Sequence, residues 1–359
     1  MKPFVHQALA SRVVFGAGSL QQLGREIEAL GATRALVLST PEQADAARRV
    51  AELLGARAAG IFPRAVMHVP IETAREARDE ARRLDADCAV AIGGGSTTGL
   101  GKAIALDSGL PIIAIPTTYA GSEMTSIYGL TDAGVKKTGR DPRVLPRTVI
   151  YDPELSLSLP IGLTVTSGLN AIAHAAEGLY AFDGNPIVSL MAEEGIRAIA
   201  AALPRLTAAP TDLDARGDAL YGAWLCGSVL GAVAMGLHHK LCHTLGGSCD
   251  LPHAQTHTAM LPHTLAYNAA HAPEAMARIG RALGTSSAPL GLYALAKDNG
   301  AAVALRDIGM REQDLDRVAD IAVSNPYWNP RPFGPPQRGL IRALLQRAWE
   351  GAAPDQAAG

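Results

Sequence analysis

Between residues 12 and 116, short apolar runs alternate with longer segments of helical periodicity. The runs ALVLS (35–39), CAVAI (88–92) and PIIAIP (111–116) are almost continuously apolar. Strands buried on both faces have this composition, and helices between them predict a parallel sheet covered on both sides. After residue 155 only helical periods follow. The sequence therefore predicts an α/β, Rossmann-like domain over residues 1–155 and an all-α domain over residues 156–359.

Gly, Pro and Asp residues mark where the predicted helices begin and end. Ser19 and Gln22 have the spacing of a capping box, which predicts a helix that runs to about Leu30. The uncharged run 219–237 has the length of a membrane span, but we expect a buried helix in a helical domain. Further helices are expected at 41–54, 71–84, 98–106, 166–183, 186–203, 213–237, 239–246, 253–270, 273–283 and 338–350.

Composition excludes several classes of function. The chain has 359 residues and a net charge of −2, with acids and bases interspersed, and it has no basic stripe with interleaved aromatics. We therefore expect no nucleic-acid partner. The four cysteines lack CxxC spacing, and the N-terminal segment lacks the apolar core of a signal peptide. We expect a cytoplasmic protein with reduced thiols and no membrane association.

A glycine-rich loop follows the apolar run 88–92. Three glycines, Gly93 to Gly95, precede a helix, and a second polar loop, PTTYAGSE (116–123), follows the next apolar run. Glycines let backbone N–H groups approach a phosphate, and ligands bind outside the carboxyl ends of parallel strands. The loop does not match G-x-G-x-x-G, and Lys102 lacks the spacing of a P-loop lysine. A tight turn without a ligand remains the alternative, but two such loops favour a dinucleotide site.

The stretch His238–His263 contains six of the ten histidines. His239 and His243 are four residues apart, which places both imidazoles on one face of a helix. Gly246 and Gly247 are expected to interrupt that helix, and a new one is expected to begin just after Pro252. Imidazole is suited to proton transfer near neutral pH and to metal binding. The stretch therefore predicts a reaction centre, although each histidine alone could be a core or surface residue.

FGAGS (15–19), GGGS (93–96), PTTYAGSE and the H-x3-H-x9-H run of residues 239–253 together resemble the iron-containing (group III) alcohol dehydrogenase family. The resemblance covers nearly the whole chain. It implies a dinucleotide-binding domain for NAD(P)(H), a helical domain with a metal site, and an active site in the cleft between them. It also implies a homodimer, since members of the family are often dimeric.

The resemblance implies that residues of two loops and of one strand end bind the cofactor. Gly94, Gly95 and Ser96 would contact the pyrophosphate, and the second loop would line the cofactor with Thr117, Thr118 and Ser122. NAD-preferring members often have an aspartate at the position of Thr40. Without that carboxylate nothing repels a 2′-phosphate, so we expect both NADH and NADPH to be accepted.

The chain differs from the family at one of the residues that bind the metal. The family's ligands are an aspartate and three histidines, and the matching residues here are Asn170, His174, His239 and His253. A neutral amide leaves a divalent ion without charge compensation. A second departure is Gly99, where the glycine-loop pattern usually has an acidic residue. We therefore expect a vestigial site and no metal.

Both departures resemble the maleylacetate reductase branch of the family. The resemblance implies reduction of a carbon–carbon double bond in maleylacetate, or in its 2-chloro analogue, to give 3-oxoadipate during breakdown of aromatic compounds. Conjugate hydride addition spreads charge into an enolate, which imidazole donors can stabilise without a Lewis acid. We expect His243 and His253, with His239, to polarise the ketone and supply the proton.

The substrate would be a small dicarboxylate, so cationic groups should contact it; Lys240, Lys102 and Arg331 are the candidates in that order. The proline-rich loop 324–336 could be a lid or a packed loop. The alternatives are a metal-dependent alcohol dehydrogenase or aldehyde reductase of the same family, a dehydroquinate-synthase-like or glycerol-phosphate-type enzyme, and a relative that binds NAD(P)H without turnover.

Overall fold

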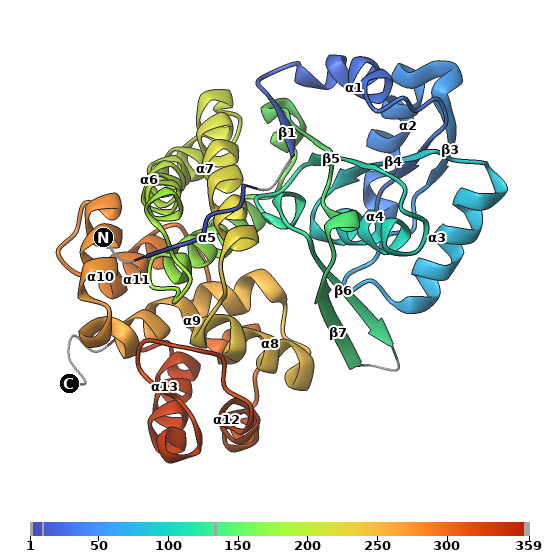
Figure 1. The fold of residues 1–359 in the computed structure, drawn as a ribbon. Coiled ribbons are helices and arrows are strands. Elements are labelled where there is room, and N and C mark those ends of the chain that lie inside the picture. Colours follow the sequence, from blue (N-terminus) through green and yellow to red (C-terminus); the bar gives the residue numbers. More distant parts are fainter. Residues whose placement is uncertain (1–2, 9–10, 133–134, 355–359) are drawn as a thin grey trace. The chain divides into compact units, whose positions relative to one another are not determined.

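The computed structural model describes residues 3–8, 11–132 and 135–354. It divides into two compact units, Ala8–Leu159 and Pro160–Gly359, with Met1–Gln7 grouped with the second unit. Each unit is described by itself (Figure 1). The α/β and all-α characters expected of the two halves are confirmed.

The first unit is built on a six-stranded parallel sheet with the order β1-β8-β5-β4-β2-β3. Its strands are β1 (Arg12–Phe15), β2 (Ala35–Leu38), β3 (Ala58–Phe62), β4 (Cys88–Gly93), β5 (Ile112–Pro116) and β8 (Thr148–Tyr151). The four inner strands β2, β4, β5 and β8 are buried along their whole length. This burial explains their continuous apolar runs, because each face of the sheet packs on helices.

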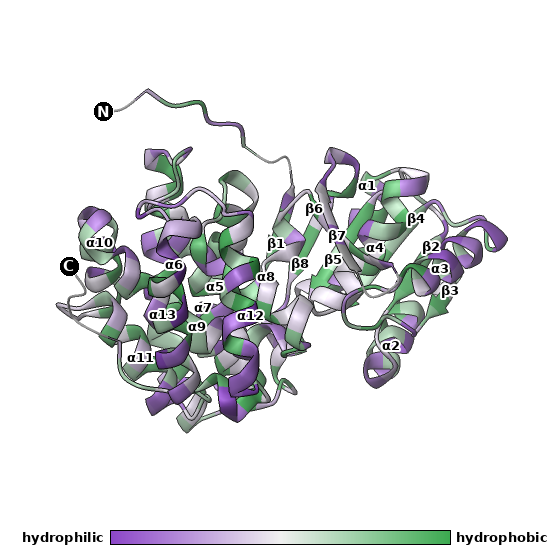
Figure 2. Ribbon diagram, turned by 90° about the horizontal axis from the view of Figure 1, so that it is seen from below, coloured by the Kyte–Doolittle hydropathy of each residue, from purple (hydrophilic) through white to green (hydrophobic). Residues whose placement is uncertain are grey.

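Helices cover both faces of this sheet. Side chains of α1 (Leu23–Ala29) and α2 (Ala44–Leu54) pack in one apolar cluster, and those of α3 (Ile71–Arg83) and α4 (Gly95–Ser108) pack in another on the opposite face. The helix α3 is hydrophilic on its exposed side, while the strands are hydrophobic (Figure 2). A separate antiparallel hairpin, β6 (Ile127–Asp132) and β7 (Val135–Arg140), has no apolar run and was not predicted.

Two predicted helix starts are wrong in detail. Ser19 does not cap α1; its hydroxyl lies 3.3 Å from the Tyr151 carbonyl, and the Asp152 carboxylate instead accepts the N–H groups of Gly18 and Leu20. A capping box involves only residues that are close in the chain, whereas the carboxylate that accepts these N–H groups belongs to Asp152, which follows the distant strand β8. The helix α4 begins at Gly95 rather than near residue 98. Gly93 ends β4 and Gly94 is the N-cap, so the glycines join strand to helix without a free loop.

The regular elements in the described part of the second unit are all helices. One apolar cluster joins α5 (Ile161–Gly178), α6 (Pro186–Ala208), α7 (Leu213–Ala232), α10 (Pro273–Leu283) and α11 (Ala288–Asp298). A second cluster joins α8 (Leu237–Cys249), α12 (Leu315–Ser324) and α13 (Arg338–Glu350), and α9 (His253–Asn268) contributes to both. Helices of both clusters are rich in Ala and Leu, which suits cores with few aromatic residues.

The uncharged run 219–237 is not one helix. Helix α7 ends at Ala232, and the chain turns by 94° into α8. Among the described residues no single helix is long and apolar enough to cross a membrane, although this bent pair passes by length and composition. Carboxylates fix the bend, since Asp183 accepts the N–H of Ala234 and Glu177 accepts the N–H groups of Gly236 and His238.

Candidate active site

The predicted cofactor residues meet at one edge of the sheet. Thr40 follows β2, Gly94–Ser96 follow β4, and Thr117 and Thr118 follow β5, and these three strands are neighbours. Gln43 donates to the Thr117 hydroxyl at 2.8 Å, which joins the loops of β2 and β5. The strand order also reverses here, since β3 and β4 lie on opposite sides of β2. Ligands of doubly wound sheets bind at such a switch point.

The N-terminus of α4 follows directly on the glycines at the end of β4. Gly94 is its N-cap, and no side chain caps the first amides of the helix. A side chain at Gly93 (φ 150°) is excluded, because a Cβ there would lie 2.5 Å from the Thr97 hydroxyl. A Cβ at Gly94 would lie 3.1 Å from Thr118. The glycines therefore permit close packing of the two loops, and the uncapped amides remain for an anion.

Ser122 is held in place by Lys102, which the sequence suggested as a contact of the substrate. Lys102 is fully buried, and its ammonium donates to the carbonyls of Ser122, Thr125 and Ile127 at 2.7 to 2.8 Å. Burial lowers the pKa of Lys102 to about 7. The expectation that Lys102 contacts a substrate is wrong: its charge is used inside the unit, where it fixes the second cofactor loop.

Packing explains why a glycine stands at position 99. A Cβ at this position would lie 2.8 Å from a methyl group of Val69. An acidic side chain, as in the usual glycine-loop pattern, would require Val69 to move. The departure from the family pattern is therefore accommodated by the contact between α4 and the loop before α3.

In the second unit, a cage of imidazoles forms from α5, α8 and α9. The ring of His257 is central: its centroid lies 4.3 Å from that of His253, 5.0 Å from His239, 4.8 Å from His238 and 6.3 Å from His174. His239 and His174 are also in contact, at 5.2 Å. Sequence analysis missed His257, although its spacing of four residues from His253 places both on one helix face.

Glu177 is the second residue that sequence analysis missed. Its buried carboxylate accepts Nδ1–H of His239 at 2.7 Å and the N–H groups of Gly236 and His238 at 2.9 and 2.8 Å. Burial by itself raises the pKa of Glu177, but the hydrogen bond from His239 and the nearby imidazoles lower it to about 2. The carboxylate therefore stays ionised, stabilises the start of α8 and leaves Nε2 of His239 without a protein partner.

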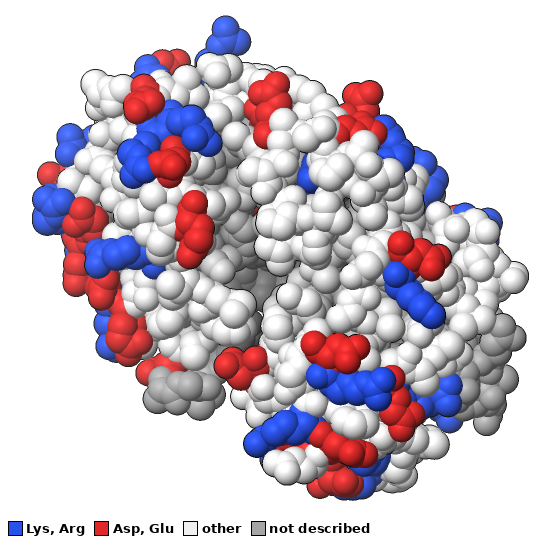
Figure 3. Space-filling view, turned by 180° about the vertical axis from the view of Figure 1, so that it is seen from behind, with Lys and Arg blue, Asp and Glu red and all other residues white. Residues whose placement is uncertain are grey.

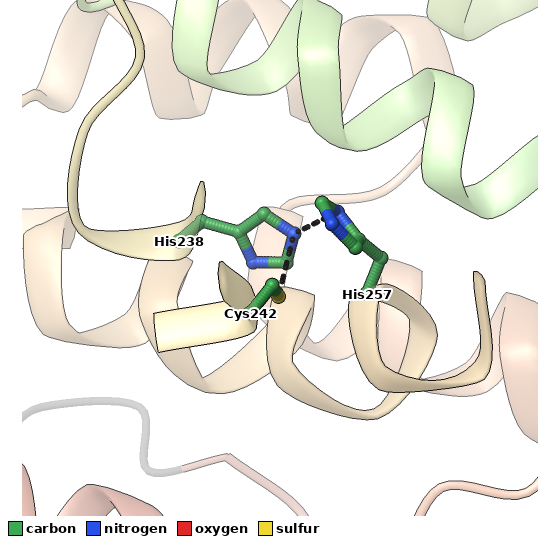
Figure 4. A group of neighbouring side chains, drawn as sticks. All are labelled: His238, Cys242 and His257. Atoms are coloured by element: carbon green, nitrogen blue, oxygen red, sulfur yellow. Dashed lines mark hydrogen bonds between the residues drawn. The ribbon is translucent and has the colours of Figure 1, made fainter. Parts of the chain in front are cut away.

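A hydrogen-bonded relay fixes His257 (Figure 4). The Thr264 hydroxyl donates to the Leu261 carbonyl, so it accepts from Nδ1 of His238 at 3.2 Å. Nε2 of His238 then accepts from Nδ1 of His257 at 3.0 Å, and Cys242 Sγ lies 3.6 Å from the same nitrogen. This tautomer, assigned from the network, leaves a lone pair on Nε2 of His257, which has no protein partner.

The predicted His243 and His253 are both exposed, at the surface of the cage. Nδ1 of His243 lies 3.5 Å from the Tyr327 hydroxyl, and His243 packs 5.9 Å from His239. The predicted break at Gly246 and Gly247 is wrong, because α8 continues to Cys249 and ends at Asp250 in the left-handed region. His239 and His243 therefore share one continuous helix.

The family's metal positions do not form a group at metal-ligand spacing among the described residues. Among the described His, Cys, Asp and Glu side chains, the one group with ligand atoms within 4.8 Å of one another is His238, Cys242 and His257. In that group Nε2 of His238 is already in hydrogen-bond contact with both His257 and Cys242. The family positions Asn170, His174, His239 and His253 lack both a carboxylate and three nitrogens at that spacing. The buried atoms Asn170 Oδ1, His174 Nδ1 and His239 Nε2 have no protein partner and remain open to a substrate or water.

Comparisons with known proteins agree with this architecture. The Fe-containing alcohol dehydrogenase models match residues 10–153 and, for the C-terminal part, residues 164–349. The chain belongs to the iron-containing alcohol dehydrogenase family. It is therefore an oxidoreductase that uses a nicotinamide dinucleotide and acts on a small molecule.

Individual relatives narrow the class. The chain is 70% identical to a maleylacetate reductase of Burkholderia cepacia over 354 residues, which is 99% of this chain and 100% of the relative. The crystal structure of maleylacetate reductase from Agrobacterium tumefaciens has a TM-score of 0.95 at 55% identity and covers 99% of this chain and 100% of that one. An iron-containing alcohol dehydrogenase from Corynebacterium glutamicum has a TM-score of 0.93 at 43% identity, with 99% of each chain covered.

Proposed function

We propose that this protein is an NAD(P)H-dependent reductase of the carbon–carbon double bond of maleylacetate, with 2-chloromaleylacetate as a second candidate substrate and 3-oxoadipate as the product. The high identity to maleylacetate reductases over the whole chain supports this function. The observation that carries it is the histidine cage, in which Asn170 stands in place of the family's aspartate and the family's four metal positions do not form a group at metal-ligand spacing.

The residues assigned below to the cofactor would hold the nicotinamide dinucleotide, which would supply a hydride to the alkene carbon. The electrons of the double bond move onto the conjugated ketone oxygen, and a proton from an imidazole completes the reduction. Negative charge at that oxygen needs hydrogen-bond donors rather than a single strong Lewis acid. The donors that we propose are His243, His253 and His239.

His239 is the best oriented of these donors. Its Nδ1–H is held by the ionised Glu177 at 2.7 Å, so a proton on Nε2 gives an imidazolium that the carboxylate stabilises. The same pairing of carboxylate and imidazole supports proton transfer in hydrolases. The structure adds His257 as a neighbour whose tautomer is fixed, while the exposed His243 and His253 border the cage.

We infer that the reaction needs no metal at Asn170, His174, His239 and His253. An ion there would polarise the ketone oxygen, which is the role we assign to the imidazole donors instead. The alternative is a metal-dependent alcohol dehydrogenase or aldehyde reductase, which family membership favours. Full activity after exhaustive chelation supports the metal-free reaction, and recovery only on addition of iron or zinc supports the alternative.

Cofactor binding is assigned to Thr40, Gly94, Gly95, Ser96, Thr117, Thr118 and Ser122. Their position at the ends of three neighbouring strands and the uncapped start of α4 support this assignment. Neutral Thr40 leaves room for a 2′-phosphate, so NADPH should be used alongside NADH. A preference for NADH above about a hundredfold in kcat/KM would contradict this reading.

The deciding experiment is the oxidation of NADH, followed by absorbance, with maleylacetate generated from a hydroxyquinol precursor. Turnover with maleylacetate and none with simple aldehydes is expected. The reverse result would favour the alcohol dehydrogenase.

We also propose a homodimer in the cytoplasm without membrane association, with a domain boundary near residue 155. Light scattering of the purified protein tests the dimer. On the face shown in Figure 3, charges of both signs are interspersed, which suits a small-molecule enzyme.

A further inference from the structure

Beside the histidine cage, the second unit has a cavity of about 330 Å³. One face of α8 forms its floor with Lys240, His243 and Gly247, and Ile321 of α12 and Tyr327 of the following loop form its walls. His243 lies three residues after Lys240 and four after His239, so the same helix connects this cavity to the cage.

The cavity has positive charge and no carboxylate. No Asp or Glu side chain lines it, and the ammonium of Lys240 makes no hydrogen bond or ion pair with a described residue. The ammonium lies 5.6 Å from the centre of the Tyr327 ring. The hydroxyls of Thr244 and Ser248 donate to backbone carbonyls of α8, so they do not supply the missing partner. A partly buried cation without an anionic partner is costly unless a ligand provides one.

The wall that contains Tyr327 is fixed. Asn329, two residues on, is buried; its amide exchanges two hydrogen bonds with Asn268, at 2.6 and 3.1 Å. Its Oδ1 also accepts the N–H of Leu237 at the start of α8. A Cβ at Gly236 would lie 3.0 Å from this oxygen, so only glycine permits the contact. The loop is therefore packed, and the Tyr327 hydroxyl has a defined position 3.5 Å from Nδ1 of His243.

We propose that Lys240 and Tyr327, with His243 beside them, form the subsite that binds one carboxylate of the dicarboxylate substrate. This inference rests on the proposed function. An ammonium and a phenolic hydroxyl are complementary to a carboxylate, and charge-assisted hydrogen bonds are the stronger ones. Because Asn329 packs the loop that carries Tyr327, little ordering of that loop opposes the affinity. The bound carboxylate would anchor the substrate next to His243 and the cage.

The first test replaces the charge. Lys240→Met should raise KM for maleylacetate roughly 10- to 100-fold, the usual range for loss of a hydrogen bond to a charged group, and Lys240→Arg should recover part of it. Lys297→Met is the matched control, because Lys297 is an exposed lysine whose ammonium also lies over a tyrosine ring, 6.0 Å from that of Tyr293. The control should keep the wild-type KM. Tyr327→Phe should raise KM by about tenfold or less.

The second test places an anion inside the cavity. A Cβ at Gly247 meets open space, so the position accepts a side chain. Gly247→Glu puts a carboxylate two helical turns from Lys240 and should raise KM well above that of Gly247→Gln, which has the same shape without charge. Equal KM values for the two variants would show that shape alone matters and would overturn the subsite.

A cofactor phosphate is the other possible anion. Titration of NADH and NADPH into Lys240→Met, followed by fluorescence, separates the two. Wild-type dissociation constants are expected, and weakened cofactor binding with an unchanged KM for maleylacetate would overturn the carboxylate subsite. If wild-type protein does not oxidise NADH with maleylacetate, the proposed function fails. If the wild type turns over and Lys240→Met has the wild-type KM, only the subsite fails.

Discussion

Replacing Lys102 with Met gives a sharp test of how the first unit holds its cofactor loop. The ammonium of Lys102 is fully buried and donates to three carbonyls and to the Thr125 hydroxyl, which lies 2.9 Å away. Methionine fills most of the same space but cannot donate. The carbonyls of Ser122, Thr125 and Ile127 would then lack this donor.

The cost can be worked from these contacts. Each buried acceptor that loses its donor costs about 1–3 kcal/mol, and loss of one partner of a buried charged network costs about 3–5 kcal/mol in total. We therefore expect Lys102→Met to lower the free energy of unfolding by roughly 3–5 kcal/mol at pH 7. Because Ser122 lies in the second cofactor loop, the affinity for NADH should also fall.

The pH dependence gives a second signature. Burial lowers the pKa of Lys102 from 10.5 to about 7 in the folded protein. Between these values the unfolded chain binds a proton that the folded protein lacks, so the free energy of unfolding of the wild type rises with pH across this window. A shift of this size corresponds to about 5 kcal/mol at most, and Lys102→Met lacks it. The stability difference between wild type and variant should therefore grow as the pH rises from 7 to 10.

Urea denaturation at pH 7 and pH 10 measures both effects, with fluorescence titration of NADH alongside. Lys297→Met, an exposed lysine of the second unit, is the control and should change neither quantity. A Lys102→Met protein with wild-type stability, an unchanged pH slope and wild-type NADH affinity would refute this account of the loop.

Three further outcomes follow from the site. Glu177→Gln should lower kcat for maleylacetate roughly 10- to 100-fold, because His239 loses the carboxylate that orients it, as steady-state kinetics will show. The pKa of Glu177 is lowered to about 2, so the stability that its carboxylate provides is present above pH 4.5 and is lost as the pH falls towards 2; the variant should lack this acid-dependent loss in urea denaturation. Gly93→Ala should weaken NADH binding by about tenfold or more, because its Cβ would lie 2.5 Å from the Thr97 hydroxyl at a φ of 150°, and an unchanged dissociation constant would be inconsistent with that crowding. Thr40→Asp should shift kcat/KM towards NADH by roughly tenfold or more through repulsion of the 2′-phosphate, and equal use of both cofactors by the variant would count against it.

The local features of the sequence determined much of this protein. Apolar runs without polar alternation require strands that are buried on both faces, so ALVL, CAVAI and IIAIP could only be central strands with helices on each side. Glycines after β4 and the spacing of His239 and His243 depend on neighbours within one helix turn. Such patterns are readable because the residues that define them are close in the chain.

Tertiary structure decided the partners of these residues. Glu177 pairs with His239 across 62 positions, and Asp152, rather than the predicted Ser19, caps the first helix of the chain. The burial of Lys102 likewise depends on a loop that is 20 to 25 positions further on. Residue type and periodicity do not specify which distant group arrives at a given atom, because that is set by how whole helices pack. Sequence alone therefore indicated a histidine centre without an anionic ligand, and packing placed the carboxylate behind His239 and His257 at the centre of the cage.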